Sequence, residues 1–356
     1  MKLSLLSILF SCLCLLSCQN ATQENPPAAT QDSLTFNFQW EHVNTPTSAS
    51  LRGLSAVSEN IAWTSGSEAT CFMTKDGGQS WQSFSFEVPD TLQFRDVEAF
   101  DAQIAYLLSA GSPGLIYKTT DGGQSWTLQY ENTHPAVFLD GMAFWNAQEA
   151  IVMGDPLEGY FTLLRTDDGG EHWERIASAN LPAPQQGEGG FAASGTNIVV
   201  QGEQHAWFAS GGKASRVFYS MDGGRQWQFA ETPVQQGEAS QGIFSLAFAD
   251  TLLGVGVGGD YLVPEDTSRI ACYTTDGGRS WQLAQQMPSG YRSGVAYFPE
   301  DQLFIAVGTN GSDYSTDFGK SWTPLDTTAF HGIQAVPGAS AAWLSGNDGR
   351  VAKLRW

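Results

Sequence analysis

Basic residues are scarce in this chain. Its 356 residues include 17 lysines and arginines against 37 aspartates and glutamates, which gives a formal charge of −20. That charge argues against a nucleic-acid partner and against electrostatic docking on anionic lipid. No histidine, cysteine and carboxylate residues cluster at metal-ligand spacing, and the glycine-rich run 254–259 precedes no evident helix, so we expect neither a metal nor a cofactor. We expect a monomer.

Long hydrophobic runs are also rare. The run from Leu3 to Leu16 is too short for a stable membrane span but is typical of a signal sequence, and no later run is long enough to cross a membrane. It ends in Leu-Leu-Ser-Cys18, which resembles the lipobox of bacterial lipoproteins. We therefore predict a signal peptide over residues 1–17, lipidation of Cys18, and an exported protein anchored to the cell envelope. An ordinary cleaved signal with incidental cysteines is the alternative.

Few cysteines remain for the body of the protein. Two of the five lie within the signal and Cys18 takes the lipid, which leaves Cys71 and Cys272. They occupy corresponding strands of different repeats, too far apart for a disulfide, so we expect two buried thiols. Residues 18–33 show no hydrophobic period and are predicted to be a flexible tether, and residues 34–356 are predicted to be the folded body.

Six copies of a short motif run through that body. The first copy, from Thr74 to Trp81, reads Thr-Lys-Asp-Gly-Gly-Gln-Ser-Trp. The aspartate can accept N–H groups across a tight turn, glycine supplies positive φ, and the tryptophan can pack between sheets. We therefore expect a structural role, at the turn between the third and fourth strands of each repeat. The motif aspartates are Asp76, Asp121, Asp168, Asp222, Asp276 and Asp317.

The two ends of the body hold complementary fragments. The last repeat stops after the strand-like run Val351 to Leu354 without a motif, whereas Thr35 to Trp40 look like an outer strand with no inner strands before it. Pairing of these fragments would complete a seventh blade and leave no exposed sheet edge. The repeat spacing also suits four short strands per blade. We predict an all-β, seven-bladed β-propeller, closed by the N-terminal strand pairing with the C-terminal blade.

The six motifs resemble the BNR or Asp-box repeats of bacterial sialidases, sortilin-type receptors, and the photosystem II assembly and stability factors of cyanobacteria and plastids. The form Thr-x-Asp-Gly-Gly-x-Ser-Trp and the sevenfold count are most similar to the photosystem factors. Those relatives are non-enzymatic, so the resemblance implies a protein-binding or assembly role. The resemblance to sialidases implies an alternative function, that of a glycoside hydrolase. Their Phe/Tyr-Arg-Ile-Pro motif is absent here, and no catalytic residue is assigned, although Tyr261 or Tyr291 could be considered as a nucleophile.

Basic residues recur at one position of the predicted innermost strands. We align these strands on a small residue that is followed by a large apolar one. The residues four positions before that small residue are then equivalent: Arg52, Arg95, Ile243, Arg292 and His331. Because the seventh blade adjoins the first, the three arginines and the histidine would form an arc at the channel mouth, opposite the Asp-box turns. We expect the arc to bind a carboxylate of an envelope protein or an anionic glycan. Alternatively, each arginine pairs with a nearby acid, such as Asp96 or Glu98, and fills the channel.

Long connections lengthen the repeats of blades three to five. Loops on a rigid scaffold commonly carry recognition, although tolerated surface insertion is equally possible for any one of them. From these connections we add five predicted ligand-binding residues: Asp155, Glu188, Lys213, Asp260 and Tyr261. The sequence thus predicts a membrane-tethered extracytoplasmic binding or assembly module that recognises a partner at the propeller mouth.

Overall fold

The structure is a computed structural model that describes residues 36–356. Within this range no helix has the length and apolar character needed to cross a membrane. The predicted signal peptide, the lipidation site Cys18 and the tether lie outside the described residues. Residues 37–356 form one compact unit.

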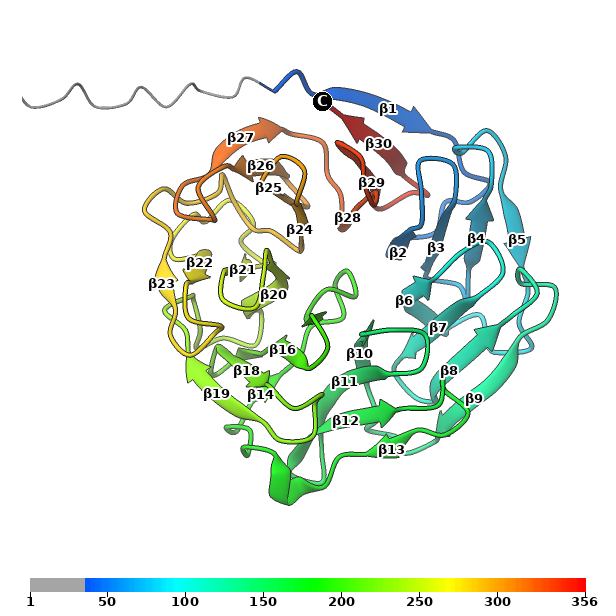
Figure 1. Ribbon diagram of the computed structural model, residues 1–356, viewed down its shortest axis with the longest axis horizontal. Helices are drawn as coiled ribbons and strands as arrows, with labels where there is room; N and C mark the ends of the chain where they lie inside the picture. The colour runs from blue at the N-terminus through cyan, green and yellow to red at the C-terminus, as the bar shows by residue number, and fades with distance from the viewer. Residues whose placement is uncertain (1–35) are drawn as a thin grey trace, which may run out of the picture. The chain divides into compact units, whose positions relative to one another are not determined.

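Residues 36–356 fold into seven antiparallel sheets arranged as blades around a central channel (Figure 1). Blade 1 contains β2 (Leu51–Ala56), β3 (Ala62–Gly66), β4 (Cys71–Thr74) and β5 (Gln82–Phe84), and blade 2 contains β6 (Gln93–Ala99), β7 (Ala105–Ala110), β8 (Gly114–Thr119) and β9 (Thr127–Asn132). Blade 3 contains β10 (Leu139–Phe144), β11 (Ala150–Leu157), β12 (Tyr160–Thr166) and β13 (Glu174–Arg175), and blade 4 contains β15 (Ile198–Gln201), β16 (His205–Ala209), β18 (Arg216–Ser220) and β19 (Gln228–Glu231).

The remaining blades follow the same order, with the first strand nearest the channel. Blade 5 contains β20 (Gln241–Phe248), β21 (Gly254–Asp260), β22 (Ala271–Thr274) and β23 (Gln282–Leu283), and blade 6 contains β24 (Gly294–Phe298), β25 (Leu303–Gly308), β26 (Gly311–Ser315) and β27 (Thr323–Asp326). Blade 7 contains β28 (Gly332–Ala335), β29 (Ala341–Ser345), β30 (Val351–Arg355) and the N-terminal strand β1 (Gln39–Val43). The prediction of an all-β propeller with seven blades is confirmed.

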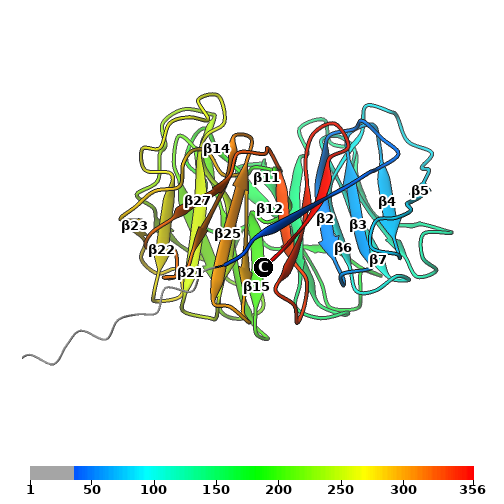
Figure 2. The same cartoon turned by 90° about the horizontal axis from the view of Figure 1, so that it is seen from above.

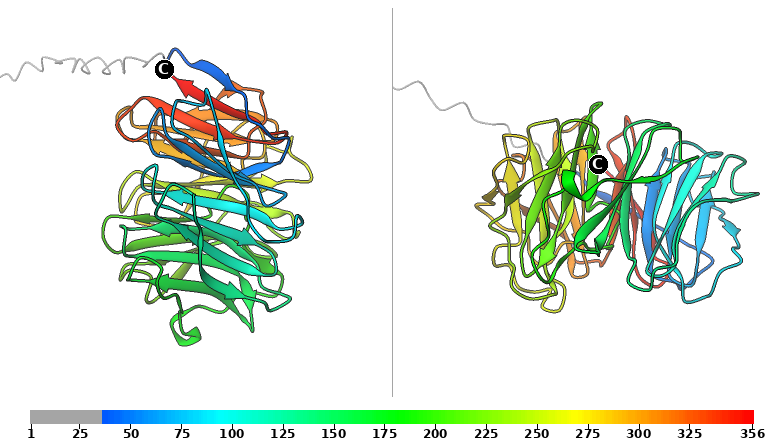
Figure 3. Two further views of the ribbon diagram at one scale, coloured as in Figure 1. Left: turned by 90° about the vertical axis from the view of Figure 1, so that its right-hand side faces the viewer. Right: turned by 90° about the horizontal axis from the view of Figure 1, so that it is seen from below.

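Strand β1 closes the ring by pairing with β30. The two strands are antiparallel and in register from Gln39 opposite Arg355 to Val43 opposite Val351. Trp40 stacks on Phe330, with ring centroids 5.6 Å apart. The predicted pairing of the terminal fragments is therefore correct, and views from the side show the blue and red strands side by side (Figures 2 and 3).

Position within a blade explains the hydrophobic pattern of each strand. The second strand of a blade lies between two other strands and between two neighbouring sheets, so both faces are buried; all six residues of β7 are buried. The fourth strand is the outer edge, and β9 is largely exposed or half-buried. Continuous apolar runs therefore mark the inner strands, and mixed sequences mark the outer ones.

The Asp-box turns join the third and fourth strands, as predicted. In the second copy, the Asp121 carboxylate accepts bonds from the Ser125 N–H at 2.9 Å and the Ser125 hydroxyl at 2.6 Å. The Thr119 hydroxyl donates to Asp121 at 2.9 Å and accepts from the Gly123 N–H at 2.9 Å. Gly123 has φ +79°, a conformation that glycine adopts readily. In the third copy His172 replaces the serine.

Tryptophans pack between the blades. Trp63, Trp207, Trp322 and Trp343 are fully buried. Trp343 of blade 7 donates to the Ser58 carbonyl of blade 1 at 3.0 Å and meets the box residue Trp81 edge to face. A box tryptophan and an inner-strand tryptophan thus join neighbouring blades. Cys71 and Cys272 are buried free thiols, as predicted, and burial raises the pKa of both.

Blade 5 is extended toward the channel by two short strands that the sequence did not predict. Strands β17 (Gly211–Gly212) and β14 (Glu188–Gly189) add to β20, so that the sheet order is β14-β17-β20-β21-β22-β23. Strand β14 lies in the connection from blade 3 to blade 4. The one short 3-10 helix of the described residues, η1 (Ser178–Asn180), lies earlier in that connection. After β14 the chain enters the channel as residues 190–197, which we call the channel loop.

Candidate functional site

The channel loop separates two cavities at opposite ends of the channel. One cavity, of about 450 Å³, lies where the innermost strands begin and is lined by Arg52, Arg95 and His331; we call it the arginine cavity. The other, of about 520 Å³, lies where those strands end, on the face that carries the Asp-box turns; we call it the box-face cavity. Because the third strand of each blade runs parallel to the first, the turn that follows it lies at the box-face end.

A β-bulge places each of the two arginines. In blade 1 the pairing passes from Leu51 opposite Gly66 to Gly53 opposite Ser65, which leaves Arg52 as the extra residue. In blade 2 the pairing skips Arg95 in the same way. A bulge turns a side chain away from its regular direction. The two guanidinium groups therefore line the same cavity from neighbouring blades.

Both arginines bind the channel loop and neither forms an ion pair, although the buried Asp140 acts on Arg95 through its charge. Arg52 Nη1 donates to the Ala193 carbonyl and Arg95 Nη1 donates to the Ala192 carbonyl, each at 3.2 Å. Arg95 also donates twice to Gln93 Oε1, at 2.9 and 2.7 Å. Among residues 36–356 neither guanidinium forms an ion pair. Burial and the nearby Arg95 lower the pKa of Arg52 to about 10, so Arg52 remains charged at neutral pH.

Arg292 does not lie on the cavity wall beside them. Its side chain is fully buried and forms an ion pair with Asp313, and Nη1 donates to Asn310 Oδ1 at 2.7 Å. The alignment on small residues caused the misplacement. In blade 1 the residue in line with the first residue of the Asp box is Ala56, which pairs with Ala62. In blade 6 the residue at that position is Tyr297 and not Ala296. Counting back four residues from Tyr297 reaches Ser293. By the same count Phe244, and not Ile243, is the bulge residue of blade 5.

His331 lines the arginine cavity as an uncharged group. Its Nε2 lies 2.7 Å from Asn347 Oδ1 and 3.3 Å from the Ser50 hydroxyl. Burial and the charge of Arg52 lower the pKa of His331 to about 4. It therefore contributes hydrogen bonding and not charge at neutral pH.

The residues predicted on long connections divide into two groups. Asp155 and Tyr261 line the arginine cavity, and Asp155 Oδ1 accepts the Gly190 N–H at 2.7 Å. Glu188 is buried and pairs with Arg216, while Asp260 caps its own turn by accepting the Leu262 N–H at 2.9 Å. Lys213 is exposed and lies 3.9 Å from Glu238. Glu188, Asp260 and Lys213 therefore do not line this cavity.

An aromatic wall that sequence reasoning missed faces the arginines. Phe191 of the channel loop stacks on the bulge residue Phe244, with centroids 3.8 Å apart, and Tyr291 meets Phe244 edge to face at 4.9 Å. Phe191 stands in an irregular glycine-rich segment with no period, so the sequence offered no signal for it. The cavity thus combines two cationic groups with an apolar wall, which suits an anion attached to an apolar group.

Each cavity has one carboxylate on its wall: Asp155 in the arginine cavity and Glu98 in the box-face cavity. Asp140 lies nearby but is fully buried, and burial together with Asp155 raises its pKa well above the ordinary value. Ordinary glycosidase chemistry needs two accessible carboxyl groups about 5 to 9 Å apart. No group of three or more potential ligands among residues 36–356 could hold a metal ion. The geometry therefore supports binding better than hydrolysis.

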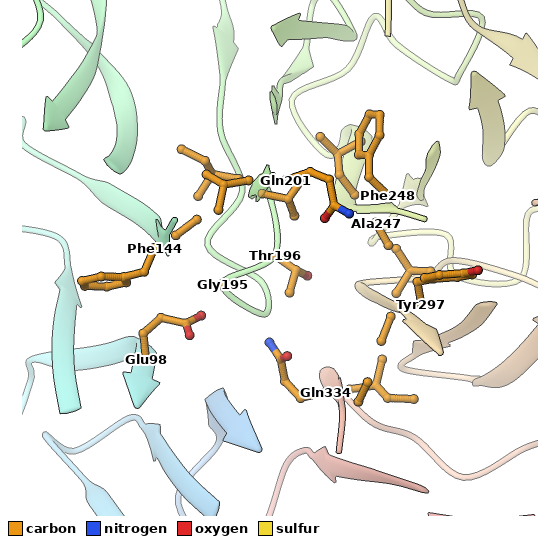
Figure 4. Close-up of a pocket in the computed structure, with 18 of the residues that line it drawn as sticks. Glu98, Phe144, Gly195, Thr196, Gln201, Ala247, Phe248, Tyr297 and Gln334 are labelled. Atoms are coloured by element: carbon orange, nitrogen blue, oxygen red, sulfur yellow. The ribbon is translucent and has the colours of Figure 1, made fainter. Parts of the chain in front are cut away.

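The box-face cavity is polar at its centre. Figure 4 shows Glu98, Gln201 and Gln334 pointing into the channel around Gly195 and Thr196 of the channel loop. The loop is held there by bonds to four blades: Arg52 and Arg95 at one end, Ser194 to the Ser293 carbonyl at 2.8 Å, and Thr196 to the Ser245 hydroxyl at 2.6 Å.

Comparisons with known proteins agree with this fold. Residues 33–137 match the family model of the photosynthesis system II assembly factor YCF48, and residues 313–324 match the BNR/Asp-box repeat. No curated protein sequence matches the chain. Among solved structures, YCF48 bound to a D1 peptide is similar with a TM-score of 0.64 and 17% identity, covering 91% of this chain and 98% of that one.

Two further structures are similar. YCF48 from Cyanidioschyzon merolae has a TM-score of 0.63 and 18% identity, and covers 89% of this chain and 98% of its own. An ancestral GH74 enzyme has a TM-score of 0.61 and 14% identity, and the match covers 87% of this chain but 45% of that one. At these identities the likeness concerns the fold. The chain is a BNR-repeat, seven-bladed β-propeller that resembles the photosystem II assembly factor YCF48.

Proposed function

We propose that this protein is a binding or assembly module, tethered to the cell envelope through Cys18, that holds a partner protein by an anionic group in the arginine cavity. The carboxylate of the partner would lie between Arg52 and Arg95, and an attached apolar group would pack on the wall formed by Phe191, Phe244 and Tyr291. An acidic sugar offers the same anion and is the second source of such a ligand.

The observation that carries the proposal is the pair of adjacent arginines that form no ion pair. The three buried arginines Arg165, Arg216 and Arg292 each form an ion pair with a carboxylate, whereas the half-buried Arg52 and Arg95 do not. Burying two unpaired cations side by side is costly unless a ligand compensates them. A guanidinium can hold a carboxylate through two parallel bonds, and Arg52 forms one hydrogen bond with the described residues, which leaves donors for a ligand.

The similarity to YCF48 bound to a D1 peptide supports a protein partner over a sugar. The lipobox-like sequence before Cys18 supports attachment to a membrane. Hydrolysis is less well supported, because the arginine cavity presents the single carboxylate Asp155 and that group already accepts the Gly190 N–H.

The test is capture of envelope proteins and glycans by residues 34–356, compared between the native chain and the double variant Arg52→Gln/Arg95→Gln. The double variant should fold normally and lose the captured partner. A matched control is Arg225→Gln/Arg279→Gln, which removes the same charge from exposed arginines in Asp-box turns. Equal capture by a well-folded Arg52→Gln/Arg95→Gln variant would exclude the arginine cavity as the recognition site.

A further inference from the structure

The box-face cavity has a wall of small residues around a polar centre. Alanines from four blades, Ala99, Ala143, Ala296 and Ala335, line it, and their small side chains keep that end of the channel open. The channel loop forms the floor, with Gly195 and Thr196 toward the cavity (Figure 4). The cavity, about 520 Å³ in volume, is large enough to admit one side chain or small ligand.

Three polar side chains enter this cavity from different blades and lack partners. Glu98 comes from β6, Gln201 from β15 and Gln334 from β28, and Figure 4 shows all three pointing inward. None of the three side chains forms a hydrogen bond or ion pair with another of the described residues. Each offers an oxygen that can accept a hydrogen bond.

The one acidic group on this wall has no cationic partner. Glu98 is the one charged residue among those that line the cavity, and Tyr297 is the other titratable one. Asp96, two residues before Glu98 on the same strand, is buried behind it and accepts the Met142 N–H at 2.7 Å. Glu98 is therefore the carboxyl group that faces this end of the channel, and no lysine or arginine lines the cavity with it, whereas Arg52 and Arg95 line the cavity at the opposite end.

We propose that the box-face cavity is a second binding site that takes a protonated primary amine, either a lysine side chain or a free amino terminus. An ammonium group has three N–H donors and no acceptor. The Glu98 carboxylate and the amide oxygens of Gln201 and Gln334 supply three acceptors, one from each of three blades. The positive charge of the ammonium group stabilises the ionised form of Glu98. A neutral sugar would offer the Glu98 carboxylate no positive charge, so charge selects the amine.

Proton release should accompany binding. Burial, and then the charge of Asp96, raise the pKa of Glu98 well above its ordinary value, so this carboxyl group keeps its proton to a higher pH than an ordinary glutamate does. An ammonium group binds the carboxylate form, so its binding transfers that proton to the buffer. Binding should therefore tighten as the pH rises through the Glu98 titration, and it should weaken again near the lysine pKa of about 10.4.

Calorimetry on the full chain tests the site with two matched probes. Nα-acetyl-lysine methylamide carries the amine, and Nα-acetyl-norleucine methylamide has nearly the same shape without it. We expect the lysine probe to bind with one-to-one stoichiometry and the norleucine probe to bind about tenfold more weakly or not at all. A lysine-free peptide with a free amino terminus, compared with its acetylated form, distinguishes the second source of the amine.

Variants then locate the site. Glu98→Gln should weaken binding of the lysine probe about tenfold and abolish proton release. Glu171→Gln, which removes an exposed carboxylate from an Asp-box turn of the same face, should bind as the native chain does. Glu98→Gln should also retain any partner held at the arginine cavity, which separates this site from the proposed function. Equal affinity for both probes, unchanged binding by Glu98→Gln, or displacement of the lysine probe by calcium at equimolar concentration would overturn the proposal.

Discussion

Arg52 and Arg95 occupy equivalent bulge positions of neighbouring blades, and each donates from Nη1 to a carbonyl of the same loop, at Ala193 and Ala192 respectively, over 3.2 Å. Two successive carbonyl groups thus hold two successive guanidinium groups. This arrangement orients the arginines without neutralising them, because a carbonyl accepts a hydrogen bond but carries no net charge. The remaining donors are therefore positioned before any ligand arrives.

Arg292 provides the contrast, because its role is structural. Replacing Arg292 with Gln leaves Asp313 as a buried carboxylate without its cation, which costs about 3 to 5 kcal/mol of stability. Urea unfolding should show this loss for Arg292→Gln and a much smaller one for Arg52→Gln. The double variant Arg292→Met/Asp313→Leu should recover much of the stability, because it leaves neither charge unpaired. Equal unfolding midpoints for Arg292→Gln and Arg52→Gln would contradict the structural assignment.

Closure of the ring gives the second prediction. Deletion of residues 34–43 removes β1, exposes the edge of β30, and takes away the stacking of Trp40 on Phe330. We expect a sharply lower midpoint of thermal unfolding and a tendency to aggregate. Deletion of residues 19–33 serves as the control and should leave the midpoint unchanged. Thermal unfolding that is the same for both deletions would refute closure by strand β1.

The Asp-box turn should matter for stability and not for binding. Asp121→Ala removes the acceptor of the Ser125 N–H and of two hydroxyl groups, so the midpoint of thermal unfolding should fall by a few degrees. Asp121→Asn keeps one acceptor oxygen and should have a smaller effect. Below the unfolding temperature both variants should retain the partner. A normally folded Asp121→Ala protein that has lost binding would show that the turn belongs to the recognition surface.

The repeat made the fold predictable from the sequence. Six Asp-box copies set the number of blades, and the unfinished last repeat together with the early strand indicated how the ring closes. Both signals are local, because turn chemistry depends on a few adjacent residues. The two short strands β14 and β17 could not be predicted, since their four residues, three of them glycine, carry neither a period nor a hydrophobic pattern.

The site was less predictable than the fold for a physical reason. In blade 6 Tyr297 stands where blade 1 has Ala56, so aligning the strands on alanine put blade 6 one residue out of step, and a shift of one residue moves a side chain to the opposite face of its strand. The alignment therefore placed Arg52, Arg95 and His331 at the cavity but misplaced Arg292, which points to Asp313. The aromatic wall depends on Phe191, which reaches the channel through a loop whose path no local sequence pattern specifies.

Stability should depend on pH with opposite signs for two kinds of aspartate. Within the Asp-box turns, hydrogen bonds from Ser80 lower the pKa of Asp76 to about 2, and hydrogen bonds from His172 lower the pKa of Asp168 to about 2. The stabilisation from these two aspartates is present above the ordinary pKa of about 4 and is lost as the pH falls toward 2. Burial raises the pKa of Asp96 to about 7, so its contribution is present below about pH 4 and is lost as the pH rises through 7.

Asp96→Asn isolates the second effect. Urea midpoints measured at about pH 5 and pH 8 should differ less for Asp96→Asn than for the native chain, because the amide cannot ionise. The native chain should be less stable at pH 8 than at pH 5. The acid-side decline should be the same in both proteins, since the Asp-box turns are untouched. A native chain whose stability rises between pH 5 and pH 8 would contradict the raised pKa of Asp96.

The position of the channel loop depends on Gly195. This residue has φ +76°, and a Cβ atom there would lie 2.2 Å from Asp96 Oδ1 and 2.6 Å from Asp96 Cγ. Gly111 has a similar backbone conformation, φ +90°, but a Cβ atom there would meet nothing within 4 Å. Alanine at either position bears the cost of the left-handed backbone, about 1 to 2 kcal/mol, so the difference between the two variants measures the contact with Asp96.

Gly195→Ala should therefore be less stable than Gly111→Ala in urea unfolding, because the buried Asp96 has little room to move away from the new methyl group. The same substitution should displace the channel loop and with it the Ala192 and Ala193 carbonyls that orient the two arginines. Partner capture should then fall for Gly195→Ala and persist for Gly111→Ala, when both are measured under conditions where each protein is folded. Equal stability of the two variants would mean that the loop does not pack on Asp96. Equal capture with unequal stability would mean that the arginines keep their orientation without the loop, so that pre-organisation by the two carbonyl groups contributes nothing to recognition.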